Sequence, residues 1–266
     1  MIPDGLGLMN PKKLTFVQKL LGVARSPRIA CHPIRGLFVL SHMRSRSSAL
    51  SHVLGSHPKI VGHGELLRSY RSWFDLAMSK IELKVEPRHE YFHDKLLHNY
   101  TKLADSQLTS PHNKILFLMR QPIPCAESFT RLYRMEEPNC NRSDEEIHGQ
   151  FLEYYRHRIP RLVAMANKVG SAARLIESDS LLDETDSVLK RLSQFLGIEP
   201  ELSSEFQLFA DSGTSGHGDT TGGLKSGRLL RRVHSEVTPI RTELVDQFQQ
   251  VYDGGLSAIK EVVPCL

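Results

Sequence analysis

The most constraining feature of this 266-residue chain is the stretch from Gly36 to Leu50, which changes from apolar to polar and back to apolar. Its first part, Leu37 to Leu40, is a short unbroken apolar run, as is typical of a buried parallel strand. A polar turn follows, and from Ser48 onward apolar residues recur at helical spacing until His57-Pro58, where a helix should end. The pattern therefore predicts a strand, a tight loop and a helix in direct succession.

The polar turn between this strand and helix is rich in hydrogen-bond donors. It contains two arginines and three serines: Arg44, Ser45, Arg46, Ser47 and Ser48. The start of a helix offers free backbone N–H groups and the positive end of the helix dipole, so a doubly anionic group is the natural ligand. The turn lacks the lysine of the GxxxxGK[ST] nucleotide loop, which counts against that loop. A solvated basic turn is the other interpretation.

Further strands and helices alternate along the chain. Strands are predicted at 60–61, 114–119 and 173–176, and helices over 66–84, from Pro122 onward, over 144–170 with an interruption at Pro160, over 185–196 and over 236–262. Strands separated by helices favour an α/β fold, a three-layer arrangement with a central parallel sheet flanked by helices and ligands at the carboxyl ends of the strands. We expect a single domain over 1–266, with a lead-in segment at 1–35 and a flexible glycine-rich loop at 210–228.

Composition and charge limit the classes of partner. The net charge of +4 suits an acidic ligand but is too small and too dispersed to favour nucleic acid. The four cysteines form no CxxC pair, so free thiols in a reducing, cytoplasmic setting are expected. The longest apolar run, Ile115 to Met119, is far shorter than the ~20 residues of a membrane span.

Residues His89 to His93 match the HExxH pattern of zinc proteases, in which two histidines bind the metal and the glutamate acts as a base. That chemistry needs the motif inside a long helix, with a third ligand downstream. Here Pro87 lies two residues before the motif and no partner motif follows. We therefore expect no metal, and keep a zinc hydrolase only as a minor alternative.

With these motifs placed, the chain resembles the sulfotransferases that use 3′-phosphoadenosine 5′-phosphosulfate (PAPS). In that family a strand ends in a basic residue followed by Ser-Gly-Ser/Thr-Ser/Thr and a helix, and this loop binds the 5′-phosphosulfate. Residues Arg44 to Ser48 match the loop except that Arg46 stands in place of glycine. In the second motif an arginine at a strand end and a serine eight residues later bind the 3′-phosphate, and Arg120 and Ser128 match it.

Two further segments extend the resemblance, which covers roughly 37–228. His57 to Ile60, followed by Gly64-Glu65, is similar to the segment of tyrosylprotein sulfotransferases that carries their catalytic glutamate. Asp179 to Leu182 and Phe195 to Gly197 are similar to the family's acidic-Asp-Leu-Leu and Phe-Leu-Gly stretches. The resemblance implies the P-loop-like sulfotransferase fold.

The resemblance also implies roles for individual residues. Glu65 is the general-base candidate, His63 is the reserve, and Arg44 stabilises charge on the leaving phosphate, because a guanidinium is a poor proton donor. A carboxylate at a helix start is the other interpretation of Glu65. If the loop closes as in the family, Arg46 adds a third cation over the donor. The residues expected to bind PAPS, or its product adenosine 3′,5′-bisphosphate (PAP), are Arg44, Ser45, Arg46, Ser47, Ser48, Ala49, Arg120, Ser128, Lys225, Gly227 and Arg228.

The implied function is in-line transfer of a sulfuryl group from PAPS to an acceptor hydroxyl or amine, with a general base and without metal. We expect a small molecule or a glycan as the acceptor. Two alternatives stay open beside the zinc hydrolase. One is a nucleotide or small-molecule kinase on a similar scaffold, and the other is a non-catalytic phosphonucleotide-binding module, which would tolerate the loss of Glu65.

Overall fold

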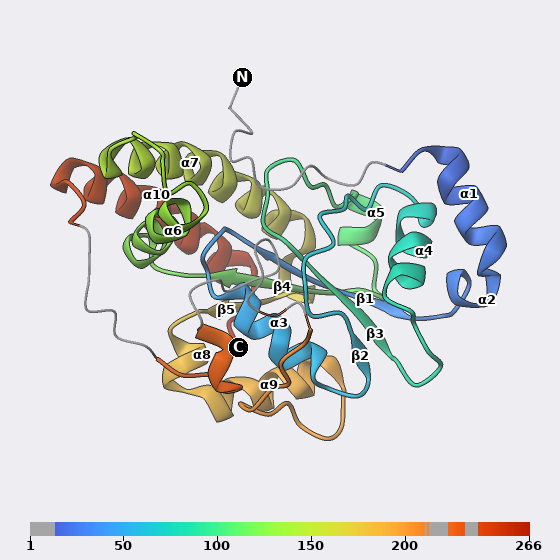
Figure 1. Ribbon diagram of the computed structural model, residues 1–266. Helices are drawn as coiled ribbons and strands as arrows, with labels where there is room; N and C mark the ends of the chain where they lie inside the picture. The colour runs from blue at the N-terminus through green and yellow to red at the C-terminus, as the bar shows by residue number, and fades with distance from the viewer. Residues whose placement is uncertain (1–13, 211, 213–222, 232–238) are drawn as a thin grey trace.

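The computed structural model describes residues 14–210, 212, 223–231 and 239–266 (Figure 1). Its centre is a five-stranded sheet in the order β2-β3-β1-β4-β5, and all neighbouring strands run parallel. The strands are β1 (Arg35–Ser41), β2 (Ile60–Val61), β3 (Tyr91–Leu96), β4 (Lys114–Met119) and β5 (Arg174–Glu177). The predicted α/β fold with a parallel sheet is therefore confirmed.

Helices cover both faces of this sheet (Figure 1). One face carries α3 (Ser47–Gly55), α8 (Ser180–Asp183) and α9 (Thr185–Leu196). The other face carries α4 (Trp73–Glu82), α5 (Asp105–Leu108), α6 (Pro122–Glu136), α7 (Asp144–Val169) and α10 (Thr242–Val262). The short helices α1 (Phe16–Arg25) and α2 (Pro27–Ala30) pack beside α4.

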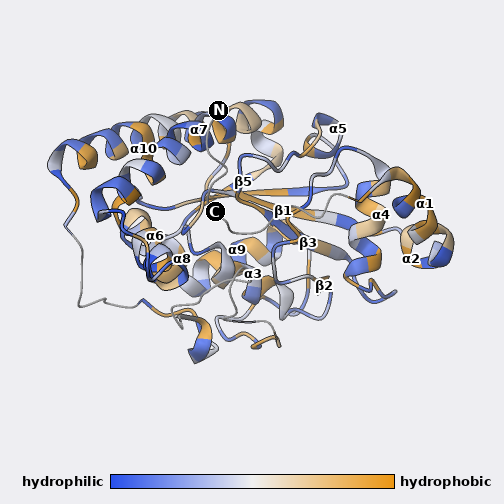
Figure 2. Ribbon diagram, turned by 45° about the horizontal axis from the view of Figure 1, so that its top comes forward, coloured by the Kyte–Doolittle hydropathy of each residue, from blue (hydrophilic) through white to orange (hydrophobic). Residues whose placement is uncertain are grey.

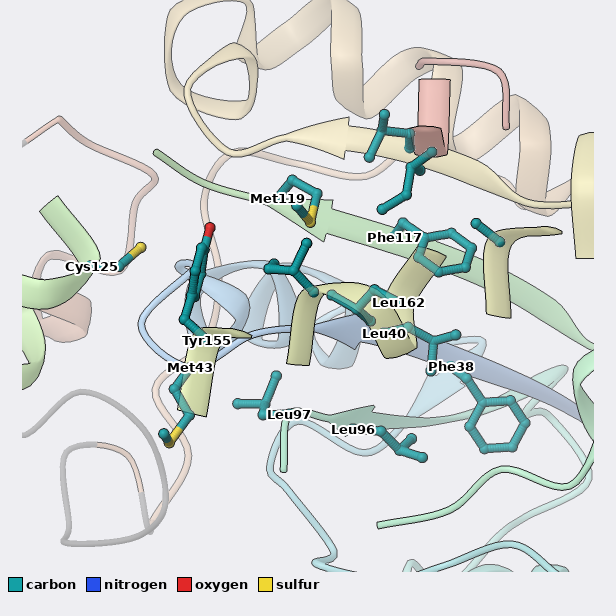
Figure 3. Close-up of a cluster of buried hydrophobic side chains, with 14 of the residues drawn as sticks. Phe38, Leu40, Met43, Leu96, Leu97, Phe117, Met119, Cys125, Tyr155 and Leu162 are labelled. Atoms are coloured by element: carbon teal, nitrogen blue, oxygen red, sulfur yellow. The ribbon is translucent and has the colours of Figure 1, made fainter. Parts of the chain in front are cut away.

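The strands divide their side chains between two hydrophobic clusters, because successive residues of a strand point to opposite faces. Phe38 and Leu40 of β1 lie in the larger cluster, which Figure 3 shows together with Leu162 of α7. Leu37 and Val39 lie in the smaller cluster, against α3 and α9. Burial on both faces explains the nearly continuous apolar runs of the strands (Figure 2).

One strand has no counterpart among the sequence expectations. β3 lies between β1 and β2 and is buried along its whole length. It carries His93, Asp94 and Lys95, so it lacks the apolar run that predicts a buried parallel strand. Each of these three side chains has a hydrogen-bond partner inside the protein, which offsets the cost of burying it.

Three helix predictions were wrong in detail. Residues 66–72 are not helical, and the helix begins only at Trp73. Pro160 does not interrupt α7, which continues to Val169 because buried residues on both sides of the proline anchor it to the core. The last helix begins at Thr242, so the predicted helix is wrong at 239–241, while its predicted start at 236 lies outside the described residues.

The lead-in segment and the glycine-rich loop are described only in part. Helices α1 and α2 belong to the lead-in, whose residues 1–13 lie outside the described part. Within the predicted loop, 211 and 213–222 also lie outside it, while Gly223–Ser226 forms a 3₁₀ helix. Among the helices of the described part, none combines the length and the apolarity needed to cross a membrane.

Candidate active site

Four of the five strands lead to a polar or charged residue at the same edge of the sheet. Arg44 follows β1, Lys95 lies near the end of β3, Arg120 comes directly after β4, and Asp179 follows β5. In open parallel sheets, ligands bind outside the carboxyl ends of the strands where the strand order reverses. In this sheet the strand order reverses at β1, because β2 and β3 lie on one side of β1 and β4 and β5 lie on the other.

The loop of residues 42–46, between β1 and α3, has an unusual backbone. Arg44 and Arg46 have left-handed φ angles of 63° and 69°, a conformation that costs an ordinary residue about 1–2 kcal/mol. Oγ of Ser41 donates to the Leu118 carbonyl at 2.5 Å and lies 2.6 Å from Oγ of Ser45. Within the described residues, the backbone amides of 45–48 donate to no backbone carbonyl. They are therefore oriented for an anion over the first turn of α3.

The second predicted anion motif lies directly against this loop. Nε of Arg44 donates to Oγ of Ser128 at 2.9 Å, and Nη1 of Arg120 donates to the Arg44 carbonyl at 2.8 Å. Nε of Arg120 is buried and has no hydrogen-bond partner among the residues described. A buried guanidinium N–H of this kind is a donor that a phosphate oxygen would satisfy. The residues of the two predicted phosphate sites are thus in contact with one another.

Arg46, which stands where the family has glycine, points to the end of β5. Its Nη1 donates to Oγ of Ser178 at 3.1 Å and to Oδ1 of Asp179 at 2.8 Å. Asp179 also pairs with Arg231 at 3.4 Å. Burial acts to raise the pKa of Asp179, but the Arg46 hydrogen bond and the nearby guanidinium charges lower it below its ordinary value. The charge of Arg46 is therefore shared with a carboxylate of its own chain.

Glu65 lies in the turn after β2 with only 7% of its side chain exposed, and its Oε1 is 3.4 Å from Nε2 of His98. Nearby, Nζ of Lys95 donates to Oγ of Ser48 at 2.8 Å. Burial lowers the pKa of Lys95, while the charges of Glu65 and Asp94 oppose that shift. Glu65 and Lys95 thus belong to one buried polar cluster beside the loop. The helix-start interpretation of Glu65 is wrong, because α4 begins eight residues later.

Two more of the predicted residues lie near the loop, His63 and Ala49. The ring of His63 is stacked on Phe209, with the ring centroids 3.7 Å apart. The amide of Ala49 donates to the Arg46 carbonyl at 3.0 Å and closes the first turn of α3.

Two of the three predicted residues at the end of the glycine-rich loop, Gly227 and Arg228, contact the segment 205–206. Gly227 accepts from the amide of Phe206 at 2.7 Å, and Arg228 pairs with Glu205 at 3.1 Å. In the part of the chain that the structure describes, no hydrogen bond joins Lys225, Gly227 or Arg228 to the residues of the loop after β1. Arg231 makes the nearer approach, since it pairs with Asp179.

Two residues of α7 that the sequence analysis did not single out support the loop. Buried Arg158 donates from Nε to the Ser41 carbonyl at 2.7 Å and from Nη1 to the His98 carbonyl at 3.3 Å. The hydroxyl of Tyr154 accepts from the Met43 amide at 2.9 Å and donates to the carbonyl of Leu97, the residue after β3, at 2.7 Å. An arginine within the apolar stripe of a helix was the only sequence signal for this role.

The HExxH residues do not form a metal site. The motif requires both histidines on one face of a helix, whereas here the second histidine lies in β3 and the first in the turn before it. The ring of His93 bonds to the Leu37 carbonyl at 3.1 Å and to Oγ of Ser51 at 2.8 Å, and burial lowers its pKa to about 3. Glu90 pairs with Arg35 and Lys59, each at 2.7 Å. The zinc-hydrolase alternative is therefore wrong.

Comparison with known proteins bears on the fold. No protein-family model and no curated protein matches the chain. Among solved structures, the chain is similar to the sulfotransferase domain from the curacin biosynthetic pathway, at 15% identity and a TM-score of 0.54, over 85% of this chain and 98% of that chain. It is similar to the sulfotransferase STF9 from Mycobacterium avium, at 10% identity and a TM-score of 0.59, over 90% of this chain and 81% of that one.

A third similar structure is the mouse sulfotransferase SULT7A1 complexed with PAP, at 16% identity and a TM-score of 0.53, over 86% of this chain and 89% of that chain. Identities this low show a common fold rather than a common substrate. The shared architecture agrees with the parallel sheet and the strand–loop–helix unit described above. The chain therefore has the sulfotransferase fold.

Proposed function

We propose that the protein is a sulfotransferase that moves a sulfuryl group from PAPS to an acceptor hydroxyl or amine. The observation that carries the proposal is the pair of contacts from Arg44 to Ser128 and from Arg120 to the Arg44 carbonyl. These contacts join a helix-start loop and an arginine–serine pair, which suits the two phosphate positions of one adenylate. The sulfotransferase fold, and a neighbour of that fold solved with PAP, support the same proposal.

Each phosphate position of the donor has its own proposed residues. The amides of 45–48, with the hydroxyls of Ser47 and Ser48, would hold the 5′ end over the first turn of α3. Arg120 and Ser128 would hold the 3′-phosphate, with the buried Nε of Arg120 as an available donor. Ala49 would line the loop, and we propose that Lys225, Gly227 and Arg228 close over the nucleotide.

Bound PAPS supplies the sulfuryl group, which passes in line between two oxygens through a loose transition state. The work of this chain is therefore positioning and stabilisation of charge. Arg44 is permanently cationic and would stabilise the negative charge that grows on the leaving phosphate. Lys95, which is held by Ser48, would place a second cation beside the loop.

Glu65 is the proposed general base, which takes the proton from the acceptor oxygen as that oxygen attacks. Its place in the cluster with Lys95 supports this role over His63, whose ring is stacked on Phe209. Because only 7% of the Glu65 side chain is exposed, a slender hydroxyl on a small molecule or a glycan is the proposed acceptor. The four cysteines are free thiols, which suits the proposed reducing, cytoplasmic setting.

The test is transfer of labelled sulfate from PAPS to a panel of phenols, aliphatic alcohols, amines and oligosaccharides. The proposal predicts transfer to at least one class by the wild-type protein and loss of transfer in Glu65→Gln. Binding of PAP without transfer to any acceptor would favour the non-catalytic binding module. Binding of ATP in preference to PAP would favour the kinase alternative.

A further inference from the structure

Asp94 of β3 bonds to the residue that follows the proposed base, and it is not among the proposed donor ligands. Its side chain is on the strand face opposite to that of His93 and Lys95, and the residue is 1% exposed. Its carboxylate accepts three hydrogen bonds: from the amide of Leu66 at 3.0 Å, from the amide of Lys95 at 2.8 Å, and from the hydroxyl of Tyr70 at 2.6 Å. One carboxylate therefore joins β3 to the turn that carries Glu65.

The turn after Glu65 needs such support because its backbone is strained. Leu67 has a left-handed φ of 50°, which costs about 1–2 kcal/mol for a residue with a branched side chain. The segment 66–69 is not part of a helix or a strand, so no regular ladder fixes it. Asp94 holds it at two points, Leu66 and Tyr70, and Ser79 of α4 bonds to the Tyr70 hydroxyl at 3.3 Å.

The charges around Asp94 make its carboxylate an electrostatic neighbour of the base. Glu65 lies in the adjacent turn, Tyr70 bonds to the carboxylate, and Lys95 follows it in β3 with its side chain on the other face. Arg68 acts on Tyr70 and pairs with Glu82 of α4, which also contributes the neutral Ser79. Burial, and then the charge of Glu65, raise the pKa of Asp94 to about 7 against the effect of its donors. Like charges so arranged disfavour each other's ionised form.

We propose that Asp94 is a positioning residue for the transfer reaction, which fixes the turn that carries Glu65 and, through its negative charge, makes Glu65 a stronger base. This inference rests on the proposed function. A proton on Glu65 is stabilised by a neighbouring carboxylate, so the base accepts the acceptor's proton more readily while Asp94 is ionised. The proposed ligands of the 3′-phosphate, Arg120 and Ser128, belong to the other side of β1.

The test is the Asp94→Asn variant, which keeps the shape and one acceptor oxygen but removes the charge. Turnover is measured as PAP released from PAPS, with p-nitrophenol as the acceptor and with water alone. We expect kcat to fall about 10- to 100-fold. The acidic limb of the pH profile should move to lower pH by about 0.5 unit or more, because the coupled pair takes up its first proton near pH 7 in wild type, whereas the variant has only Glu65 to take up a proton. PAP affinity by calorimetry should stay unchanged.

Two further variants make the result specific. Tyr70→Phe removes the hydrogen bond from Tyr70 to Asp94 but keeps the charge of Asp94. We therefore expect kcat to fall without a shift of the acidic limb to lower pH. This variant carries the test if Asp94→Asn does not fold. Asp186→Asn, on the exposed first turn of α9, is the matched control and should behave as wild type.

The outcomes separate the inference from the proposed function. Unchanged kcat and an unchanged pH profile in Asp94→Asn, with active wild-type protein, overturn the role of Asp94 alone. Unchanged kcat in Tyr70→Phe overturns it as well if that variant carries the test. A wild-type protein that neither binds PAP nor releases it from PAPS overturns the proposed function and, with it, this inference.

Discussion

Nε of Arg44 donates to Oγ of Ser128 at 2.9 Å, although 84 residues separate the two in the sequence. The contact links the loop after β1 to the second turn of α6. Because Arg120 also donates to the Arg44 carbonyl, at 2.8 Å, the two predicted phosphate motifs form one continuous surface of donors. The proposed binding of a single adenylate with two phosphate groups depends on this continuity.

The Ser128→Ala variant should weaken PAP binding about tenfold to 100-fold. The hydroxyl accepts from Arg44, so it can donate its own proton to the 3′-phosphate, and a hydrogen bond to a charged group contributes about 1.5–3 kcal/mol. Binding of adenosine 5′-monophosphate, which lacks the 3′-phosphate, should not change. Calorimetric titration of both nucleotides checks this, and an equal loss for the two would contradict the assignment of Ser128 to the 3′-phosphate.

The Glu65→Gln variant should lose catalysis but keep the donor site. The amide has the size of the carboxylate but cannot accept a proton, so kcat should fall about 10²–10⁴-fold. PAP affinity should remain close to that of the wild-type protein, because the glutamine keeps the size of the side chain and leaves Arg120 and Ser128 unchanged. Steady-state kinetics and calorimetry on the same preparation provide the measurement. Retained turnover would shift the role of base to His63.

The Arg46→Gly variant tests the residue that departs from the family motif. Glycine removes the cost of the left-handed backbone, about 1–2 kcal/mol. The variant loses a partly exposed ion pair with Asp179, of about 0–1 kcal/mol, and the hydrogen bond to Ser178, of about 0.5–1.5 kcal/mol. We expect a melting temperature close to that of wild type. PAP affinity should change less than about threefold, because Asp179 already shares the charge of Arg46. A loss of 100-fold would instead assign Arg46 to the donor as a third cation.

His93 and Asp94 should give the protein's stability opposite dependences on pH. Burial lowers the pKa of His93 to about 3, so below pH 6.5 the unfolded state takes up a proton that the folded state does not, and stability falls as the pH falls. The raised pKa of Asp94, about 7, has the reverse effect, because the folded state binds the proton first as the pH falls from neutrality.

Melting temperatures at pH 7.5 and pH 5 in two variants separate these contributions. His93→Gln should lose less stability on acidification than wild type, by about 2 kcal/mol, because it lacks the buried histidine. Asp94→Asn should lose more, because it lacks the carboxyl that takes up a proton in the folded state. Equal losses in wild type and both variants would contradict the buried, neutral state of His93 and the raised pKa of Asp94.

Sequence patterns predicted the parts of the fold that depend on local order. The apolar run Leu37 to Leu40 and the polar turn after it predicted β1, the loop and α3, because burial on both faces leaves an unbroken apolar signal. β3 was missed for the opposite reason. Its segment His93 to Lys95 is polar, and only the tertiary structure supplies the partners that allow it to be buried.

The candidate site was predictable where a motif has fixed spacing and not where it depends on distant partners. The spacing of Arg120 and Ser128, which matches the family motif, predicted that the two residues act together, and in the structure both contact Arg44. The pairing of Arg46 with Asp179 spans 133 residues, and no pattern in the sequence connects them. The support that Arg158 gives to the ends of β1 and β3 is of the same kind, since it depends on how α7 crosses the sheet.

The measurement that tests the central claim most directly is calorimetric titration of PAP into wild-type protein and the Arg120→Ala variant, with adenosine 5′-monophosphate as the comparison ligand. The account predicts that wild type binds PAP at least about 100-fold more tightly than the monophosphate, and that Arg120→Ala removes most of this difference. Equal affinities of wild type for the two nucleotides, or unchanged PAP affinity in Arg120→Ala, would contradict it.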